Sequence, residues 1–373
     1  MLEDGKISNK QLILLVFIFR EVVNLTYFPL LNAPPKNQDL WISIFLSLPI
    51  QLVLTAPIYY LWTKFPNKTI IQYSQLIAGK AGKLLGFIYV CFFIHLTSVL
   101  MVQFSYFLVI AIMPETPITF FLISFMLVCA YAVRNGLEVI VRLTEIFVPI
   151  IIIAVIMIVI FMYKIIDFKT LLPIMENGFT PIFYGAFTTA SRSVEIMIFA
   201  MLFPFLNNFQ KVKSTIFFAY LLIDFNVLLI TIPTITIFGI ADATNHLFPF
   251  FDAIKLVNIS DFWEHIEVIH MAVWLCGIVI QVSTLYYLAS LGIGQLFNLK
   301  DYKPIVLPLG TIIVSLAILI APNVIEQFEF LNYKTFIWYS LFFILAIPLI
   351  LAILALIFKK GEKQLWVDKK SLI

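Results

Sequence analysis

Residues 185–204 read GAFTTASRSVEIMIFAMLFP, and this stretch decides the fold because it places Arg192 and Glu195 inside an otherwise apolar run. A matching apolar run near the N-terminus carries Arg20 and Glu21. A charged side chain at the centre of a bilayer costs roughly 2.5–3.5 kcal/mol even on permissive insertion scales, so it faces a bundle interior, a partner or a water-filled cavity. We therefore expect these four charges to mark the working centre of a membrane protein.

The composition agrees with that interpretation. Hydrophobic residues make up 62% of the 373 residues and charged residues only 12%, whereas about a quarter of the residues in a soluble domain are charged. The formal net charge of +3 argues neither for nucleic acid nor for an acidic substrate. The sequence predicts an all-α polytopic membrane protein.

Ten apolar windows are long enough for the roughly 20 residues that a helix needs to cross the hydrocarbon core. They run approximately over Ser8–Leu31, Leu40–Thr63, Gly82–Ile112, Pro117–Val133, Leu143–Tyr163, Phe179–Phe205, Ser214–Gly239, Val268–Phe297, Pro304–Ala321 and Lys334–Phe358. We interpret residues 1–373 as one integral membrane domain, with repeats at about 8–163 and 179–358 and a tail at 359–373.

The distribution of cations predicts the orientation. Of the 24 Lys and Arg residues, 17 fall on the side of the predicted bundle that holds both termini and five on the other side, and Arg20 and Arg192 lie within the spans. Because cytoplasmic loops carry an excess of Lys and Arg, both termini are predicted to be cytoplasmic.

The ten spans divide into five and five, which predicts an inverted repeat because an odd number of spans reverses the second half. Long polar connections precede the third and eighth spans, at Lys64–Ala81 and Ile240–Glu267, and apolar residues at helical spacing predict a short interfacial helix in each. In such proteins the first helix of each half is often interrupted near the midplane. We expect interruptions within Phe19–Pro29 and within Gly185–Pro204.

These two segments supply the predicted ligand site. Its residues are Arg20, Glu21, Asn24, Thr26, Thr188, Thr189, Ser191, Arg192 and Glu195. Arg20 and Glu21 are about 100° apart on a helix, so we expect pairing between helices, Arg20 with Glu195 and Glu21 with Arg192. Two interpretations stay open: a structural ion-pair cluster, or a zwitterion site whose guanidinium takes a ligand carboxylate and whose carboxylate takes an ammonium.

Other polar positions within the spans give weaker signals. Asp224 has no cation in its own span, and two interpretations stay open: it is a candidate for proton or cation coupling, or it has a shifted pKa or an interhelical hydrogen bond. Five further polar residues lie within the spans: His95, Gln103, Gln281, Ser283 and Thr284. For each of these, helix packing is the simpler interpretation.

An enzymatic function is not expected. His265 and His270 are five residues apart rather than the four of a zinc-protease helix. No catalytic residue, cofactor or metal ion is predicted.

Several short motifs occur in a characteristic order over nearly the whole chain. They are Lys64-Phe65-Pro66, Ala78-Gly79-Lys80-Ala81-Gly82-Lys83, Asn135-Gly136-Leu137-Glu138 with Arg142, Asn177-Gly178-Phe179-Thr180-Pro181-Ile182 with Gly185, Phe238-Gly239, Phe248-Pro249 and the segment 262–274. In this order and spacing the sequence resembles the spore germination permease family, the B-type membrane subunits of the germinant receptors of endospore-forming bacteria.

The resemblance implies a ten-helix fold related to the amino acid, polyamine and organocation transporters. It implies residence in the inner spore membrane, with an A-type membrane subunit and a C-type lipoprotein subunit as partners. The implied role is recognition of a small germinant, commonly an amino acid, and Glu195 corresponds to a glutamate often found in the sixth helix of the family. In the first helix, Phe19-Arg20-Glu21-Val22 stands where the family tends to carry a glycine-containing bend.

Three functional hypotheses follow. The first is a germinant-sensing receptor subunit, which we favour; the second is a proton- or cation-coupled amino-acid transporter; the third is a scaffold subunit with a self-paired site. A sensor and a transporter can share a fold, so the fold alone does not separate them.

Overall fold

The computed structural model describes residues 5–26, 37–257 and 266–361. These residues form helices almost throughout, and among them the only β-type pairing is an isolated bridge between Ile7 and Leu206. The predicted all-α class is confirmed.

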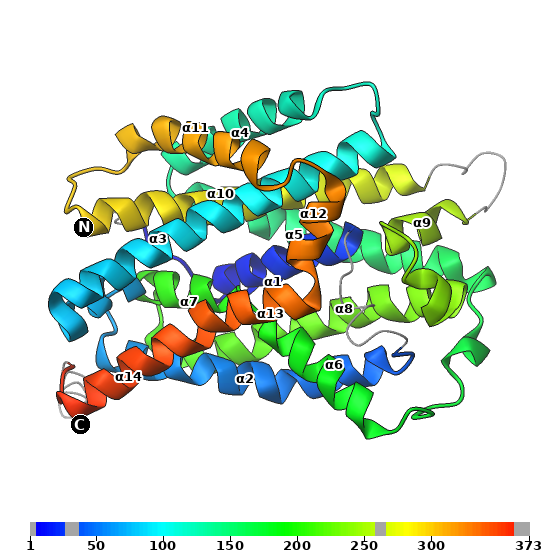
Figure 1. Cartoon of the computed structure of the whole chain (residues 1–373), viewed down its shortest axis with the longest axis horizontal. Coiled ribbons are helices and arrows are strands. Elements are labelled where there is room, and N and C mark those ends of the chain that lie inside the picture. Colours follow the sequence, from blue (N-terminus) through cyan, green and yellow to red (C-terminus); the bar gives the residue numbers. More distant parts are fainter. Residues whose placement is uncertain (1–4, 27–36, 258–265, 362–373) are drawn as a thin grey trace.

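The helices follow one another in the order shown in Figure 1. Their bounds are α1 Asn9–Thr26, α2 Leu40–Lys64, α3 Ile70–Ala111, α4 Ile118–Arg134, α5 Leu137–Phe161, η2 Met162–Lys164, η3 Phe168–Leu171, α6 Phe179–Ser191, α7 Ile196–Leu202, η4 Phe203–Phe205, η5 Phe209–Lys211, α8 Val212–Ala243, α9 Pro249–Lys255, α10 Glu267–Leu296, α11 Lys303–Ile320, α12 Val324–Leu331, α13 Tyr333–Leu341, the π-helical turn η6 Phe342–Ala346 and α14 Ile347–Ile357.

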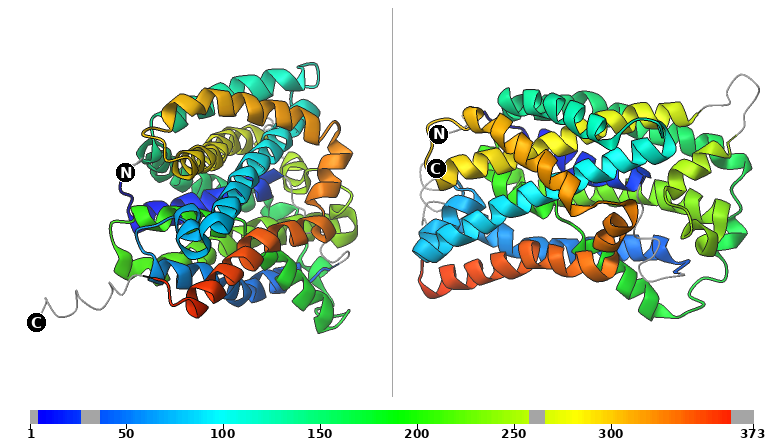
Figure 2. Two further views of the ribbon diagram at one scale, coloured as in Figure 1. Left: turned by 60° about the vertical axis from the view of Figure 1, so that its left-hand side comes forward. Right: turned by 45° about the horizontal axis from the view of Figure 1, so that its top comes forward.

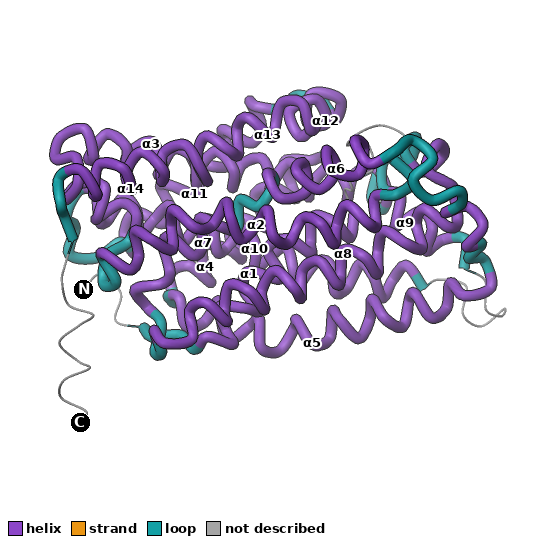
Figure 3. Tube along the Cα trace, turned by 90° about the horizontal axis from the view of Figure 1, so that it is seen from below, coloured by secondary structure: helices purple, strands orange, loops and turns teal. Residues whose placement is uncertain are grey.

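The long helices run roughly along the longest axis of the molecule (Figures 1 and 3). Helix α1 lies in the middle of the bundle and contacts α5, α8 and α10, while α4 and α11 cover one side and α2 and α14 the other (Figures 1 and 2). The start of α1 and the end of α14 lie at the same end of the bundle. This arrangement agrees with the predicted placement of both termini on one side.

The outer surface is apolar. Tyr131, Leu319 and Trp338 are each more than 70% exposed, and many other large apolar side chains are exposed on the outside of the bundle. A soluble monomer rarely carries so large an exposed apolar surface. The surface is that of a protein solvated by lipid.

Eight of the predicted spans coincide with described helices that are long and apolar enough to cross a membrane. The fourth predicted span is the 17-residue helix α4, and the first is the 18-residue helix α1, which carries Lys10, Arg20 and Glu21. The count of ten spans therefore remains a prediction. Residues 27–31 of the first predicted span and 362–373 of the predicted tail lie outside the described residues.

The two halves share an order of elements. Each predicted connecting helix is present: residues 70–78 of α3 are separated from the rest of that helix by Gly79, whose φ is +58°, and α9 precedes α10. The end of α8 is kinked at Gly239, with φ +70°. A broken helix α6–α7 opens the second half. This shared order is what an inverted repeat requires, and the repeat itself remains a prediction.

The predicted interruption of the first helix is not present in the described part of the segment. Helix α1 is continuous from Asn9 to Thr26, because neither glycine nor proline occurs between Phe19 and Thr26 and its polar side chains leave the backbone ladder intact. Tyr27 to Pro29 lie outside the described residues.

The reverse turn near the start of α3 requires a glycine at position 82, because a side chain there has no room. A Cβ added at Gly82 would lie 1.8 Å from the Ser74 carbonyl oxygen, whereas one added at Gly86 would lie 3.3 Å from methyl groups of Ile71 and Leu296 and 3.7 Å from the nearest backbone atom, Ile71 O. The Ser74 hydroxyl also donates a 3.0 Å hydrogen bond to the Gly82 carbonyl.

We therefore expect Gly82→Ala to lower the free energy of unfolding by at least about 3 kcal/mol, because backbone cannot retreat as a side chain can. Unfolding titrations in mixed detergent micelles measure the change. Gly86→Ala is the matched control, with the same added methyl group one helical turn later. Equal stability of the two variants would contradict the fold described here.

Candidate ligand cavity at the broken helix

The helix that begins at Phe179 is interrupted between α6 and α7, as the density of hydroxyl groups predicts. In an unbroken helix each N–H bonds to the carbonyl four residues earlier. Here the Ser193 N–H bonds to Ala190 O at 3.1 Å and the Val194 N–H to Arg192 O at 2.8 Å. The ladder shifts over these residues, and α7 starts again with Glu195 at its N-cap.

The break releases backbone carbonyls, and neighbouring helices satisfy two of them. Thr189 O loses the Ser193 N–H and accepts a 2.8 Å hydrogen bond from Arg20 Nη2 of α1. Ser191 O accepts a hydrogen bond from the Ser340 hydroxyl of α13. Because an unsatisfied carbonyl in hydrocarbon costs several kcal/mol, these contacts fix the broken helix against both neighbours.

One of the two predicted ion pairs is present. Arg20 Nη1 lies 3.6 Å from Glu195 Oε2, and both side chains are buried. The other predicted pair is not formed: the Glu21 carboxylate oxygens accept no hydrogen bond within the described chain, while Arg192 Nη1 donates to Leu331 O at 2.8 Å and its guanidinium lies 4.6 Å from the Phe336 ring centroid. Arg20 and Glu21 lie on different faces of α1, so only one of them reaches the break.

These side chains line a cavity of about 50 Å³. A single water needs roughly 10–15 Å³ on this measure, so the cavity accommodates a few waters or a small polar group. Its lining comes from α1, α3, α10, the break between α6 and α7, and the α12–α13 junction; the residues are Phe19, Arg20, Val23, Asn24, Leu96, Val99, Leu100, Gln103, Arg192, Val194, Glu195, Gln281, Leu331 and Phe336.

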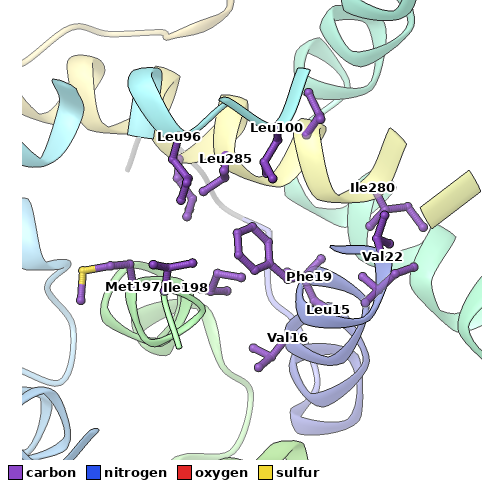
Figure 4. Close-up of a cluster of buried hydrophobic side chains, with 14 of the residues drawn as sticks. Leu15, Val16, Phe19, Val22, Leu96, Leu100, Met197, Ile198, Ile280 and Leu285 are labelled. Carbon is purple, nitrogen blue, oxygen red and sulfur yellow. The ribbon is translucent and has the colours of Figure 1, made fainter. Parts of the chain in front are cut away.

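Apolar side chains of α1 and α3, among them Phe19, Leu96 and Leu100, form part of the cavity wall. Figure 4 shows Phe19 pointing from α1 into the space among α3, α7 and α10, with Leu96, Leu100 and Leu285 on one side and Ile198 on the other. Apolar walls lower the local dielectric constant, which strengthens electrostatic interactions inside the cavity.

Unused hydrogen-bonding groups also border the cavity. The buried side-chain oxygens of Gln103 and Gln281, and the buried amide nitrogen of Asn24, have no hydrogen-bond partner within the described residues. Buried polar atoms are nearly always satisfied in folded proteins. The cavity therefore offers two acceptors and one donor in addition to its charges.

Helix α10 holds α1 beside the cavity through backbone acceptors. His270 Nε2 donates to Leu25 O at 2.8 Å, Trp274 Nε1 to Val22 O at 3.1 Å and Gln281 Nε2 to Phe19 O at 2.7 Å. The helices approach closely because a Cβ on Gly277 would lie 2.5 Å from Val22 Cγ2. His270 has a particular reason to bind there, since the residue four positions after Leu25 is proline and supplies no N–H.

Asp224 lies apart from this cavity. Gln51 Nε2 of α2 donates to its Oδ1 at 3.0 Å, and the carboxylate lines a second, apolar cavity.

Of the predicted ligand residues, Arg20, Asn24, Arg192 and Glu195 line the central cavity, and Thr189 contributes its carbonyl to Arg20. The others are buried but do not line it: Glu21, Thr26, Thr188 and Ser191. Gln103 and Gln281 do line it, whereas the sequence favours helix packing for both. Leu331 and Phe336 were not predicted, since no local signal places them beside residue 192.

The fold and the cavity together define a polytopic helical membrane protein with a polar site at a broken helix. A family model described as "Spore germination protein" matches residues 6–325. The chain belongs to this family, the spore germination permeases.

Curated relatives support the same assignment over the full length. The chain is 28% identical to spore germination protein KB of Bacillus subtilis (strain 168) over 369 residues, covering 97% of this chain and 98% of that protein. It is 22% identical to spore germination protein YndE of the same organism, covering 96% and 99% respectively.

The α1–α10 contacts lead to a stability prediction. His270→Leu should lower the free energy of unfolding by about 1–3 kcal/mol, because it removes the side-chain donor that the described residues supply to the Leu25 carbonyl. The hydrogen bond lost in Trp274→Phe should lower the free energy of unfolding by less than the one lost in His270→Leu, because Val22 O still accepts the helical hydrogen bond from the Thr26 N–H. Unfolding titrations in mixed micelles compare the variants.

His270→Gln is the control, because its side-chain amide restores a donor. We expect it to recover at least half of the loss. If glutamine is as destabilising as leucine, the histidine acts through its volume rather than through the hydrogen bond.

Proposed function

We propose that this protein is the germinant-sensing membrane subunit of a spore germination receptor and that it recognises a small zwitterion, such as an amino acid, in the central cavity. The observation that carries the proposal is the presence of buried guanidinium groups and a buried carboxylate around one cavity at a broken helix. Membership of the spore germination family supplies the biological context.

The cavity chemistry suits a zwitterion, and at about 50 Å³ the cavity has to widen to admit a whole amino acid. Arg192 is placed to take a ligand carboxylate, since a guanidinium has five N–H donors and can bind a carboxylate through two of them. Glu195 is placed to take an ammonium group together with the free oxygens of Gln103 and Gln281. The 3.6 Å separation between Arg20 and Glu195 exceeds the roughly 2.7–2.9 Å of a tight charge-assisted hydrogen bond, so Glu195 retains capacity for a ligand.

The proposal includes partners and a location. We infer an assembly with an A-type membrane subunit and a C-type lipoprotein subunit in the inner spore membrane, with both termini on the cytoplasmic side. The relatives' names, which place them in spore germination, support this inference.

A second candidate function is proton- or cation-coupled amino-acid transport. The observation in its favour is Asp224, a buried carboxylate that forms no ion pair among the described residues. A carboxylate of this kind within a span is a common coupling group. The third candidate, a scaffold with a self-paired site, draws support from the Arg20–Glu195 pair.

Reconstitution separates these functions. The purified full chain in liposomes is tested with a panel of labelled amino acids for binding and for uptake with and without an ion gradient. The proposal expects saturable binding without uptake. Gradient-driven uptake would establish a transporter, and the absence of both across the panel would favour the scaffold.

Glu195→Gln tests the role of the carboxylate. We expect at least tenfold weaker binding of the amino acid that the parent protein binds, because a charge-assisted contact contributes about 1.5–3 kcal/mol and 1.4 kcal/mol corresponds to a factor of ten. Equilibrium binding to the reconstituted protein measures the change, and the germination response of spores carrying the variant should fall in parallel.

Glu138→Gln is the matched control. It makes the same chemical change in an exposed ion pair with Arg142, at 3.2 Å, and should leave binding unchanged. Membrane yield is compared first, since removing one member of a buried pair can destabilise a protein. A well-folded Glu195→Gln protein with parental affinity would exclude the proposed role of this carboxylate.

A further inference from the structure

A second cavity opens on the lipid-facing side of the bundle between α2, α5, α8 and η3. Its volume is about 390 Å³, within the roughly 300–1,000 Å³ of small-molecule sites. Twelve residues line it, and all but one are apolar: Phe45, Leu48, Val159, Ile166, Phe168, Leu221, Phe225, Leu228, Leu229, Ile232 and Pro233. The exception is Asp224, which is 5% exposed.

The Asp224 carboxylate accepts hydrogen bonds from uncharged side chains alone within the described residues. Oδ1 accepts from Gln51 Nε2 at 3.0 Å. Oδ2 accepts a long hydrogen bond of 3.5 Å from the Ser47 hydroxyl, whose shorter contact, at 2.7 Å, is with Ile44 O. The carboxylate thus has neutral donors but no ion pair among the described residues, and an unpaired buried charge beside an apolar cavity is costly.

The aromatic side chains around the cavity fit a particular class of ligand. Phe45, Phe168 and Phe225 line it and are each more than half exposed, so they form its rim on the outer surface. Aromatic faces attract organic cations, more strongly where water is excluded. A carboxylate combined with such rings favours a positively charged nitrogen that carries an apolar body.

The depth of Asp224 distinguishes between two sources of an amine. It lies 12 residues after the start of α8 at Val212, about 18 Å along a helix that rises 1.5 Å per residue. That position is near the middle of a hydrocarbon core of about 30 Å. The amino group of a phospholipid is tied to its charged headgroup at the interface, whereas a free hydrophobic amine can enter the core as the neutral base and reach the carboxyl group at this depth.

We propose that this cavity binds a hydrophobic amine that enters from the membrane, with its nitrogen on Asp224 and its apolar body among the α2, α5 and α8 side chains. This cavity and the central cavity have no lining residue in common, and the proposal does not rest on the proposed germinant site. The protein would then have two small-molecule sites, the central cavity and this one, which is reached from the lipid.

The test uses photolabelling of the full chain in phosphatidylcholine nanodiscs with a diazirine-bearing dodecylamine. Adducts mapped by mass spectrometry should fall on the residues that line the cavity. Excess dodecylamine should reduce labelling at least tenfold, and excess dodecanol less than twofold, because the alcohol has the same tail without the charge.

Variants separate the charge from the cavity. Asp224→Asn should reduce labelling at least tenfold, and Leu221→Trp should reduce it at least fivefold by filling the cavity from a side chain that is already partly exposed. Leu319→Trp, on an exposed position of α11 outside the cavity, is the control and should label like the parent.

Three results would overturn the proposal. Equal competition by dodecanol, or parental labelling of both Asp224→Asn and Leu221→Trp, would show only non-specific lipid contact. Loss of labelling in nanodiscs rich in phosphatidylethanolamine would assign the site to a lipid headgroup instead.

Discussion

The structure depends on the need to satisfy backbone carbonyls that a broken helix exposes within a membrane. Hydrocarbon supplies no hydrogen-bond donor, so a carbonyl freed between α6 and α7 needs a donor from the protein or from the cavity. Arg20 supplies one to Thr189, and Ser340 supplies one to Ser191. Through these two contacts the break determines where α1 and α13 must lie, and with them two walls of the central cavity.

The same requirement operates where α1 meets α10. His270, Trp274 and Gln281 donate to three carbonyls spaced three or six residues apart on α1. Backbone acceptors rather than side-chain ion pairs thus position the helices around the cavity. Arg20 takes part in both kinds of contact, since one nitrogen binds the Thr189 carbonyl and the other faces Glu195. The site can therefore contain its own arginine and glutamate without being closed by them.

The sequence was a good guide wherever composition or backbone chemistry carried the information. Long apolar windows predicted the bounds of most helices, and the hydroxyl-rich patch around Arg192 predicted the break. The same reasoning failed for the first helix, because Arg20 and Asn24 are polar side chains on a backbone that no glycine or proline disrupts before Thr26.

Local sequence patterns also could not predict which side chains contact one another in the site. Glu21 follows Arg20 directly and so lies on another face, and Gln281 has the appearance of a packing residue until α1 is placed beside it. Phe336 joins the site through contacts across some 140 residues, which no spacing rule describes.

On the proposed function, these contacts connect ligand binding to the geometry of the break. The ammonium group of the ligand binds the Glu195 carboxylate and so competes with Arg20 for it. The carboxylate of the ligand binds Arg192. Arg20 then retains the Thr189 carbonyl as its anchor, so a change in its position moves the end of α6 relative to α1. A ligand shifts a conformational equilibrium only by its difference in affinity for the two states. Here the difference in affinity arises because the Arg20 guanidinium contacts both the Glu195 carboxylate, which binds the ligand, and the Thr189 carbonyl of the broken helix. Ligand binding is thereby coupled to the position of the broken helix, and a sensor that does not transport its ligand requires such coupling.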